Sequence, residues 1–282
     1  MTVHLHPPIG AVRDAVERAL AEDLTPMGDL TAALVDPGAR VNAAIVARQE
    51  GVLAGTLCVE ETCRQVDPDI AVSWEMGEGW PVQSGDVVGH LHGFLRSVLT
   101  AERTALNFLS HLSGVATLTD RFVSAVRGTG VQILDTRKTT PGLRALEKAA
   151  VRAGGGRNHR GSLSEMVLIK DNHRAGLSIA DAVKQAKEAW PARTIEVECD
   201  SIEQVGEAVE AGAQMIMLDN FQPDQIRGAV ALVEGRAVVE VSGRMNLETI
   251  RAFAAGGPDV ISVGALTHSA PVFDFGLDLE NR

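Results

Sequence analysis

A basic segment in the middle of this acidic chain has the residue types best suited to chemistry. It runs from Arg137 to Arg174 and holds nine lysines and arginines but only three acidic residues. The whole chain carries a formal charge of −11, so the positive cluster is local. Because a cleft lined by one sign of charge concentrates ions of the opposite sign, the segment predicts a site for a small polyanion. A solvated helix face is the alternative that charge alone leaves open.

Two sets of charged side chains define the chemistry of this predicted site. The cationic set consists of Arg137, Lys138, His159, Arg160 and Lys170. Arginine binds carboxylates through two parallel hydrogen bonds and lysine acts as a point charge, so this set suits a substrate with more than one carboxylate. The acidic set is Glu198 and Asp219, which suits a hydrated Mg²⁺ or sugar hydroxyls. A structural salt-bridge network is the alternative for these carboxylates.

Six short apolar runs, each ending in a polar or small residue, position these side chains. They cover residues 131–134, 166–169, 195–197, 215–218, 238–241 and 260–263. Such runs are typical of buried parallel strands, and amphipathic helical stretches lie between several of them. The carboxyl ends of barrel strands face one mouth, so the residues that follow the runs form one predicted site.

The loops after the last two runs predict a phosphate site. Ser242–Arg244 and Gly264–Leu266 occupy the positions where α/β barrels commonly hold phosphate on backbone N–H groups. Glycines also end strands for local reasons, so this signal is weak alone. No Gly-x-Gly-x-x-Gly follows the first run, which argues against a dinucleotide-binding sheet.

The N-terminal third predicts a smaller α/β domain. Its patterns indicate helices over residues 8–23 and 57–66, and strands over residues 41–46, 52–54, 70–74 and 85–93. Helical periodicity resumes at Ser97, and Ser113-Gly114 predicts a break before a second helix that ends at Arg127. We therefore expect a domain boundary after residue 113. His111, beside the apolar row of that helix, is expected to be a core or interface residue.

Composition limits the class of partner. The chain has 282 residues, of which 45% are hydrophobic and 22% charged, which predicts a globular protein with a sizeable core. Its acidic balance argues against nucleic acid as a partner. Three cysteines without disulfide or metal-ligand spacing indicate reduced thiols. The sequence shows no secretion leader and no apolar stretch of the ~20 residues that span a bilayer, so we expect a cytoplasmic protein with no membrane partner.

Seven motifs, taken together and in order, resemble those of the quinolinate phosphoribosyltransferase family, also called nicotinate-nucleotide pyrophosphorylase (carboxylating). They are Ala101–Asn107, Asp135–Thr139, Asn158–Arg160, Ile169–His173, Glu196–Glu198, Leu218–Asn220 and Val263–His268. The resemblance extends from about Glu22 to Asp278. It implies an N-terminal α/β sandwich domain, residues 1–113, followed by an open, incomplete α/β barrel of TIM-barrel type with six strands, residues 114–282.

This resemblance also implies an activity and an assembly. The family transfers the phosphoribosyl group of phosphoribosyl pyrophosphate to quinolinate with decarboxylation, and forms nicotinate mononucleotide, pyrophosphate and CO₂ in de novo NAD biosynthesis. The cofactor implied is Mg²⁺. The family resemblance further implies a homodimer, with a higher oligomer left open, in which Arg103 reaches into the barrel mouth of the partner subunit.

Site roles carried over from the family cover both substrates. The residues implied to hold the quinolinate carboxylates are Arg103, Arg137, His159, Arg160 and Lys170. The implied catalytic residues are Lys138, Lys170, Glu198 and Asp219, with both lysines on the pyrophosphate side and both carboxylates on the ribose and Mg²⁺. The further substrate-binding residues are Thr139 and, for the 5′-phosphate, Ser242, Gly243, Arg244, Gly264, Ala265 and Leu266. Arg244 stands where the family often has a small residue, which leaves its contact open.

Three other functions are weighed against this one. A molybdenum-transport-associated paralogue shares the barrel, but the Asn158–Arg160 and Ile169–His173 motifs fit the quinolinate enzyme better. A Schiff-base aldolase would use Lys170 as its strand-end nucleophile. A sensor of polyanionic metabolites would bind without turnover.

Overall fold

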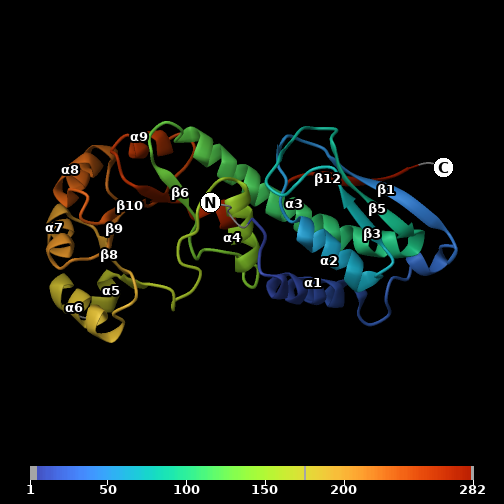
Figure 1. The fold of residues 1–282 in the computed structure, drawn as a ribbon, viewed down its shortest axis with the longest axis horizontal. Helices are drawn as coiled ribbons and strands as arrows, with labels where there is room; N and C mark the ends of the chain where they lie inside the picture. The colour runs from blue at the N-terminus through green and yellow to red at the C-terminus, as the bar shows by residue number, and fades with distance from the viewer. Residues whose placement is uncertain (1–4, 175, 281–282) are drawn as a thin grey trace. The chain divides into compact units, whose positions relative to one another are not determined.

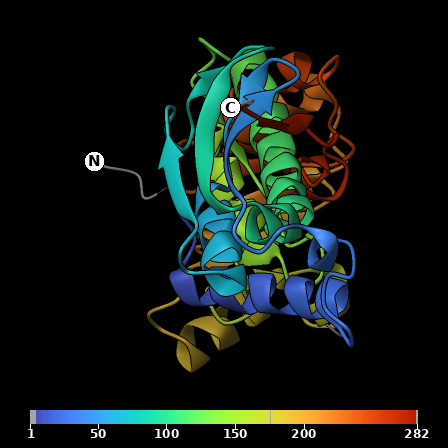
Figure 2. The same ribbon diagram turned by 90° about the vertical axis from the view of Figure 1, so that its right-hand side faces the viewer.

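The computed structural model describes residues 5–174 and 176–280, and within them the chain forms two compact units. The first unit takes in the chain up to Asp120, residues 139–155 and the chain from Leu266 onward. The second unit consists of residues 121–138 and 156–265. Figure 1 and Figure 2 show the ribbon in two views. Within the described ranges, no helix is long and apolar enough to cross a membrane.

The first unit is built on an antiparallel sheet of four strands in the order β12-β1-β5-β3. The strands are β1 (Arg40–Ala47), β3 (Ala71–Trp74), β5 (Val87–Phe94) and β12 (Phe275–Leu279). A separate pair is formed by β2 (Gly51–Val52) and β4 (Pro81–Val82). The helices are α1 (Ile9–Leu24), the 3₁₀ turn η1 (Ala32–Leu34), α2 (Thr56–Val66), α3 (Leu95–Ala125) and α4 (Arg144–Ala153), and α3 continues into the second unit.

One hydrophobic core joins the sheet of this unit to helices α2 and α3. Ile45 on β1 and Leu91 on β5 are buried in the same cluster as Val59 on α2 and Leu109 on α3. Burial of this kind is the main favourable term in folding, because apolar side chains leave water. The predicted helices and the longer predicted strands of this region are confirmed.

The C-terminal strand β12 departs from the predicted division of the chain, which assigned residues 114–282 to the barrel. Residues Ala43–Ala47 of β1 pair antiparallel with residues 275–279, so β12 belongs to the sheet of the first unit. An open edge of β1 would leave backbone N–H and C=O groups unpaired, and β12 satisfies them. A boundary after residue 113 stays a prediction for the rest of the chain.

The predicted break at Ser113-Gly114 is wrong, since α3 runs through both residues without interruption. Ser113 Oγ accepts a hydrogen bond from the backbone N–H of Ala54 (2.9 Å) and donates one to its carbonyl (3.0 Å). A Cβ at position 114 would lie 2.1 Å from the carbonyl oxygen of Pro271. Gly114 therefore permits close packing of the chain onto the helix instead of ending it.

The second unit is a parallel sheet of six strands in the order β6-β11-β10-β9-β8-β7. Its strands are β6 (Gln132–Leu134), β7 (Val167–Ile169), β8 (Ile195–Cys199), β9 (Met215–Asp219), β10 (Val238–Ser242) and β11 (Val260–Ser262). The associated helices are α5 (Asp171–Arg174), α6 (Ile179–Ala189), α7 (Ile202–Glu210), α8 (Pro223–Val233), α9 (Ile250–Ala254) and, across the unit boundary, α10 (Ala265–His268). All six strands predicted from the apolar runs are confirmed. Figure 1 shows helices α7 and α8 on the outside of this curved sheet.

The barrel is open because β6 and β7 are both edge strands. The chain between them supplies a partner for β6 instead. The backbone N–H of Arg157 donates to Ile133 O (2.8 Å), and that of Asp135 donates to Arg157 O (3.1 Å). This bridge covers the edge of β6 and directs the next residues, Asn158 to Arg160, along the opening.

We expect Gly114→Ala to lower the free energy of unfolding by about 2 kcal/mol or more, because the added methyl group overlaps a backbone carbonyl that cannot move cheaply. Urea unfolding measures the effect. The matched control is Gly228→Ala in α8, where no heavy atom outside the local helix backbone lies within 4 Å of the added Cβ. Because alanine is the better helix former, the control is expected to gain about 0.5–1 kcal/mol. Equal stability of the two variants would contradict the packing role of Gly114.

Candidate active site

Residues on the parallel strands, or shortly after them, meet in a cleft of about 380 Å³ in the second unit. In the sheet register Glu198 pairs with Met217, Met217 with Glu240, and Asp219 with Ser242. These residues therefore share one face, because side chains alternate between faces along a strand. The residues that line the cleft are Thr136, Arg137, Lys138, His159, Arg160, Leu168, Lys170, Glu198, Met217, Asp219, Glu240, Ser242 and Ser262.

Eight of the predicted site residues line this cleft together. They are Arg137, Lys138, His159, Arg160, Lys170, Glu198, Asp219 and Ser242. The expectation that strand ends converge on one mouth is thus met for the residues after five of the strands and for the 158–160 segment. Their individual roles stay predictions.

Seven predicted residues do not line the cleft. Gly243, exposed Arg244, Gly264 and Ala265 follow β10 and β11 in the second unit. Thr139 lies in the first unit, where its Oγ1 accepts a hydrogen bond from Arg144 Nε (3.0 Å). Leu266 is buried on α10, and Arg103 is exposed on α3.

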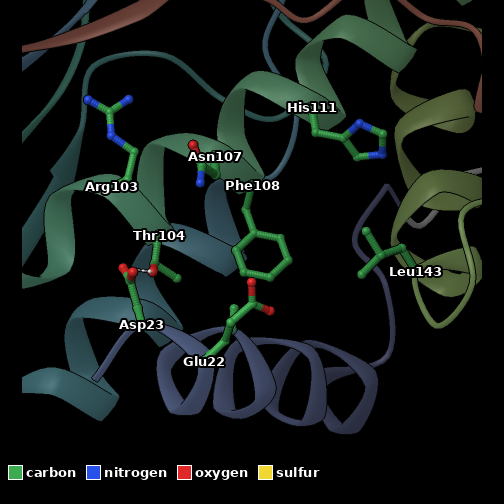
Figure 3. A pocket seen from close by; sticks show the side chains of 9 residues that line it. Glu22, Asp23, Arg103, Thr104, Asn107, Phe108, His111 and Leu143 are labelled. Carbon is green, nitrogen blue, oxygen red and sulfur yellow. Dashed lines mark hydrogen bonds between the residues drawn. The ribbon is translucent and has the colours of Figure 1, made fainter. Parts of the chain in front are cut away.

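Arg103 lines a separate pocket of about 280 Å³ in the first unit, shown in Figure 3. Asn107 and His111 follow it at intervals of four residues along α3, which places the three side chains on one helix face. The guanidinium of Arg103 points away from Glu22 and Asp23 of α1 (Figure 3) and has no ion-pair partner among the residues described. His111 Nε2 contacts buried Glu147 at 2.8 Å, as expected for a core or interface histidine.

The ammonium group of Lys170 pairs with the Glu198 carboxylate in the cleft. Asp219, on the next strand, has its pKa raised by burial and by the negative charge of Glu198. Two carboxylates that repel each other and face lysines are suited to a cation or to hydroxyl donors. An ammonium group held by a carboxylate is a poor nucleophile, which argues against the Schiff-base alternative.

Burial also affects the arginines on the opposite side of the cleft. The pKa of Arg160 is lowered by burial and by the nearby charge of Arg137. Arg160 Nη1 donates a hydrogen bond to the carbonyl oxygen of Met166 (3.0 Å), which fixes the direction of its side chain. Two neighbouring guanidinium groups that repel each other bind an anion strongly, because the anion relieves the repulsion.

His159 lies at the floor of the cleft between two carboxylates that the sequence analysis assigned no role. Its Nε2 is 3.0 Å from Glu196 Oε2 and 3.3 Å from Glu240 Oε2, and both glutamates are fully buried. Burial of the ring disfavours its charge, but the hydrogen bond with Glu196 and the negative charges of Glu196 and Glu240 outweigh burial and raise the pKa of His159 to about 10. Burial likewise raises the pKa of Glu196.

The backbone around His159 is held by Asp135, a buried residue at the end of β6. Asp135 Oδ1 accepts the His159 N–H (2.9 Å), and its Oδ2 accepts the side-chain amide of Asn158 (2.6 Å). Asp135 therefore positions the segment that carries His159 and Arg160.

Glu196, Glu240 and Ser262 are residues of this site that sequence reasoning missed. The signal was present, because Glu196 lies two residues before Glu198 and Glu240 two residues before Ser242. A period of two places each pair on one face of its strand. These residues lie within the strands, before the strand-end positions from which the site was predicted.

Comparison with known proteins agrees with this geometry along almost the whole chain. Residues 29–113 match the N-terminal domain, and residues 115–278 the C-terminal domain, of quinolinate phosphoribosyl transferase. The chain belongs to the quinolinate phosphoribosyltransferase family.

Individual relatives support the same assignment. The nicotinate-nucleotide pyrophosphorylase (carboxylating) of Mycobacterium leprae is 44% identical over 277 residues, which cover 95% of this chain and 97% of that protein. The probable counterpart in Bacillus subtilis is 41% identical, with 89% and 88% covered. The structure of the Francisella tularensis nicotinate-nucleotide pyrophosphorylase superposes with a TM-score of 0.94 at 38% identity, covering 99% of this chain and all of the other. The antiparallel sheet and the six-stranded parallel sheet are thus those of the family.

The cleft offers donors of the type that fits Mg²⁺. Glu198 and Asp219 both line the cleft and offer carboxylate oxygens, the ligand type that Mg²⁺ prefers. The ion usually keeps several waters and takes only one or two carboxylates, so two partly buried carboxylates are enough.

A second candidate metal cluster, His159 with Glu196 and Glu240, has its ligand atoms within 4.8 Å of one another. Its geometry is equally that of a protonated imidazole between two carboxylates.

We expect the His159 ring to remain protonated at pH 8, where an ordinary histidine is neutral. Because its folded pKa lies above the unfolded value of about 6.5, the charged ring stabilises the fold fully below pH 6.5. This contribution is lost as the pH rises toward about 10. Nitrogen NMR shifts of histidine-labelled protein measure the protonation directly, with His159→Gln identifying the signal. A ring that is neutral at pH 8 would show that the two carboxylates do not hold its proton.

Proposed function

We propose that this chain transfers the phosphoribosyl group of phosphoribosyl pyrophosphate to quinolinate and releases pyrophosphate and CO₂, so that nicotinate mononucleotide is formed for NAD synthesis. The observation that carries the proposal is the cleft itself. It sets Arg137, Arg160 and the lysines opposite Glu198 and Asp219 at the ends of parallel strands. Quinolinate, a planar dianion, needs the arginines, and phosphoribosyl pyrophosphate needs the lysines and the carboxylates beside them.

The quinolinate end of the cleft is formed by Arg137, His159 and Arg160. The two guanidinium groups can each bind a carboxylate through paired hydrogen bonds, and the ring of His159 adds a cation below them. Holding both carboxylates fixes the pyridine ring in its plane. Its nitrogen then has one orientation toward the ribose, which removes much of the entropic part of the barrier.

The ribose and diphosphate end is formed by Lys138, Lys170, Glu198 and Asp219. In the structure Lys170 is paired with Glu198. Binding of the diphosphate gives Lys170 a new anionic partner and releases Glu198 for the ribose hydroxyls or for Mg²⁺. Glu198 and Asp219 would hold Mg²⁺, which would supply positive charge to neutralise the leaving diphosphate.

The chemical step uses preorganised charge and needs no nucleophile from the protein. The C1–O bond to pyrophosphate lengthens while positive charge develops on the ribose, and the pyridine nitrogen supplies the electron pair for the new C1–N bond. Lys138 and Lys170 stabilise the departing pyrophosphate, and the carboxylates stabilise the sugar cation. When CO₂ leaves, the electron pair of the broken C–C bond stays at C2, where the adjacent positively charged nitrogen stabilises it. A proton then bonds to C2 in place of the carboxylate.

The 5′-phosphate would bind on the loops after β10 and β11, through Ser242, Gly243, Arg244, Gly264, Ala265 and Leu266. Thr139 would add a substrate contact. We also place the reaction in the cytoplasm, because the three cysteines are buried free thiols, which is typical of reducing compartments.

The working unit proposed is a homodimer. Arg103 has an exposed guanidinium without an ion-pair partner in the part of the chain described, so it is available to an anion outside its own protomer. We propose that Arg103 of each protomer completes the quinolinate site of the other. A higher oligomer would keep this pair as its repeating element.

The activity is tested by incubating purified protein with phosphoribosyl pyrophosphate, Mg²⁺ and either quinolinate or nicotinate. Mononucleotide and an equal amount of CO₂ are expected from quinolinate only, because the cationic pocket binds two carboxylates. A chelator added in excess over Mg²⁺ is expected to stop the reaction, and added Mg²⁺ to restore it. Product from nicotinate, or none from either substrate with folded protein, would contradict the proposal.

Donation of Arg103 is tested by mixing two inactive variants, Arg103→Ala and Lys170→Ala, and allowing subunits to exchange. If each site uses Lys170 of one protomer and Arg103 of the other, a mixed dimer contains one intact site. Random exchange of a two-fold dimer should then restore about a quarter of wild-type activity. Each variant incubated alone is the control. Failure to recover activity after exchange has been demonstrated would place Arg103 and Lys170 in the same protomer's site.

A further inference from the structure

Glu240 is a buried carboxylate that the fold itself does not require. It lies in the middle of β10 and is fully buried, and neither carboxylate oxygen has a hydrogen-bond donor within the described chain. Its cationic neighbour is His159 Nε2 at 3.3 Å, an ion-pair distance without hydrogen-bond alignment, and the carboxyl group of Glu196 lies within 4.8 Å of it. A buried carboxylate with unsatisfied oxygens opposes folding, because it has lost its water. Its presence therefore points to a role in the site.

The position of Glu240 relative to Glu196 suggests what that role is. Glu196 on β8 and Glu240 on β10 lie on the two strands that flank β9, and both approach the same ring nitrogen of His159. The backbone of His159 is fixed separately by Asp135. Asp135 thus fixes the backbone of His159, while Glu196 and Glu240 contact Nε2 at the far side of its ring.

We propose that Glu240 is a positioning residue for quinolinate binding, which holds the imidazole of His159 upright in the cleft through Nε2. The inference rests on the proposed function, in which His159 contacts a substrate carboxylate. If Glu196 were the only acceptor, the His159 ring could rotate about its side-chain bonds toward β8. Glu240, on the strand on the other side of β9, opposes this rotation, because the rotation would move Nε2 away from the Glu240 carboxylate.

Glu240 also affects the charge that the substrate meets. The two buried carboxyl groups of Glu196 and Glu240 both approach Nε2 of His159, which lines the cleft. A carboxylate on each side of Nε2 keeps the proton on that nitrogen, so that the ring presents a cation to a dianionic ligand. Loss of this arrangement weakens the binding of quinolinate more than any later step.

Two substitutions separate this role from a structural one. Glu240→Leu has similar volume and no acceptor, whereas Glu240→Gln keeps an acceptor oxygen for Nε2–H. Loss of this ion-pair contact with the His159 ring is expected to raise the Kd and the KM for quinolinate about 10-fold or more in Glu240→Leu. The kcat and the KM for phosphoribosyl pyrophosphate should stay within about threefold. Glu240→Gln should recover most of the lost affinity.

Stability supplies the second readout. Glu240 has no hydrogen-bond donor within the described chain, and Glu196 remains to pair with the His159 ring when Glu240 is replaced. Replacing Glu240 with leucine should therefore leave the Tm unchanged or raise it. The matched control is Glu61→Leu on α2 in the first unit. Glu61 is also buried, but it accepts hydrogen bonds from Arg64 and Gln65 (2.8 and 2.7 Å). The control should lower the Tm and leave the quinolinate Kd unchanged.

The deciding experiment is calorimetric titration of quinolinate into wild type, Glu240→Leu, Glu240→Gln and Glu61→Leu, together with their melting curves and metal content. Weaker binding in Glu240→Leu, with recovery in Glu240→Gln and an undiminished Tm, supports the inference. It is overturned by an unchanged Kd in Glu240→Leu, or by bound metal in wild type that Glu240→Leu loses. Wild type that neither binds nor converts quinolinate contradicts the proposed function instead, and so the two failures are distinguished.

Discussion

Opposite charges must be paired inside an open parallel barrel, and the site depends on how this is done. Arginines, lysines and a histidine enter from the β6 and β7 side, while carboxylates project from β8, β9 and β10. An ion pair that lines the cleft, such as that of Lys170 with Glu198, can separate so that each group binds a ligand instead. Where the charged groups are buried, as for His159 with Glu196 and Glu240, they hold the histidine ring in one position. The first kind serves binding and catalysis, and the second fixes geometry.

The missing strand pairing between β6 and β7 makes this possible. In a closed barrel these strands would hydrogen-bond, and the interior would be filled by packed side chains. Here the bridge from Arg157 to β6 directs Asn158 to Arg160 along the opening. The cations therefore enter on a loop that Asp135 fixes, while the carboxylates sit on rigid strands. Carboxylates on strands and cations on a loop suit a substrate that must enter and leave the cleft.

Prediction from sequence succeeded where a local pattern decides the structure. Each of the six apolar runs became a parallel strand, because a chain of buried β-branched and aliphatic residues has few other stable conformations. The strand-end rule then brought Lys170, Glu198, Asp219 and Ser242 together. Prediction from local pattern failed at Ser113-Gly114, where a polar residue followed by glycine indicated the end of a helix. Both residues instead serve contacts with Ala54 and Pro271, far away in sequence.

By itself, then, the sequence determined the elements, the open six-stranded barrel through its family motifs, and the cationic and acidic sets. The elements and the two charged sets follow from periodicity and residue type, which act locally, whereas the open barrel is what the family resemblance implies. Only the tertiary structure decided that β12 completes the first sheet, that α3 is continuous, and that Glu196 and Glu240 share one nitrogen of His159. Each of these depends on strand register and on burial against a distant part of the chain. The free energy of a buried charge or an open edge is set by those neighbours, and no local pattern records them.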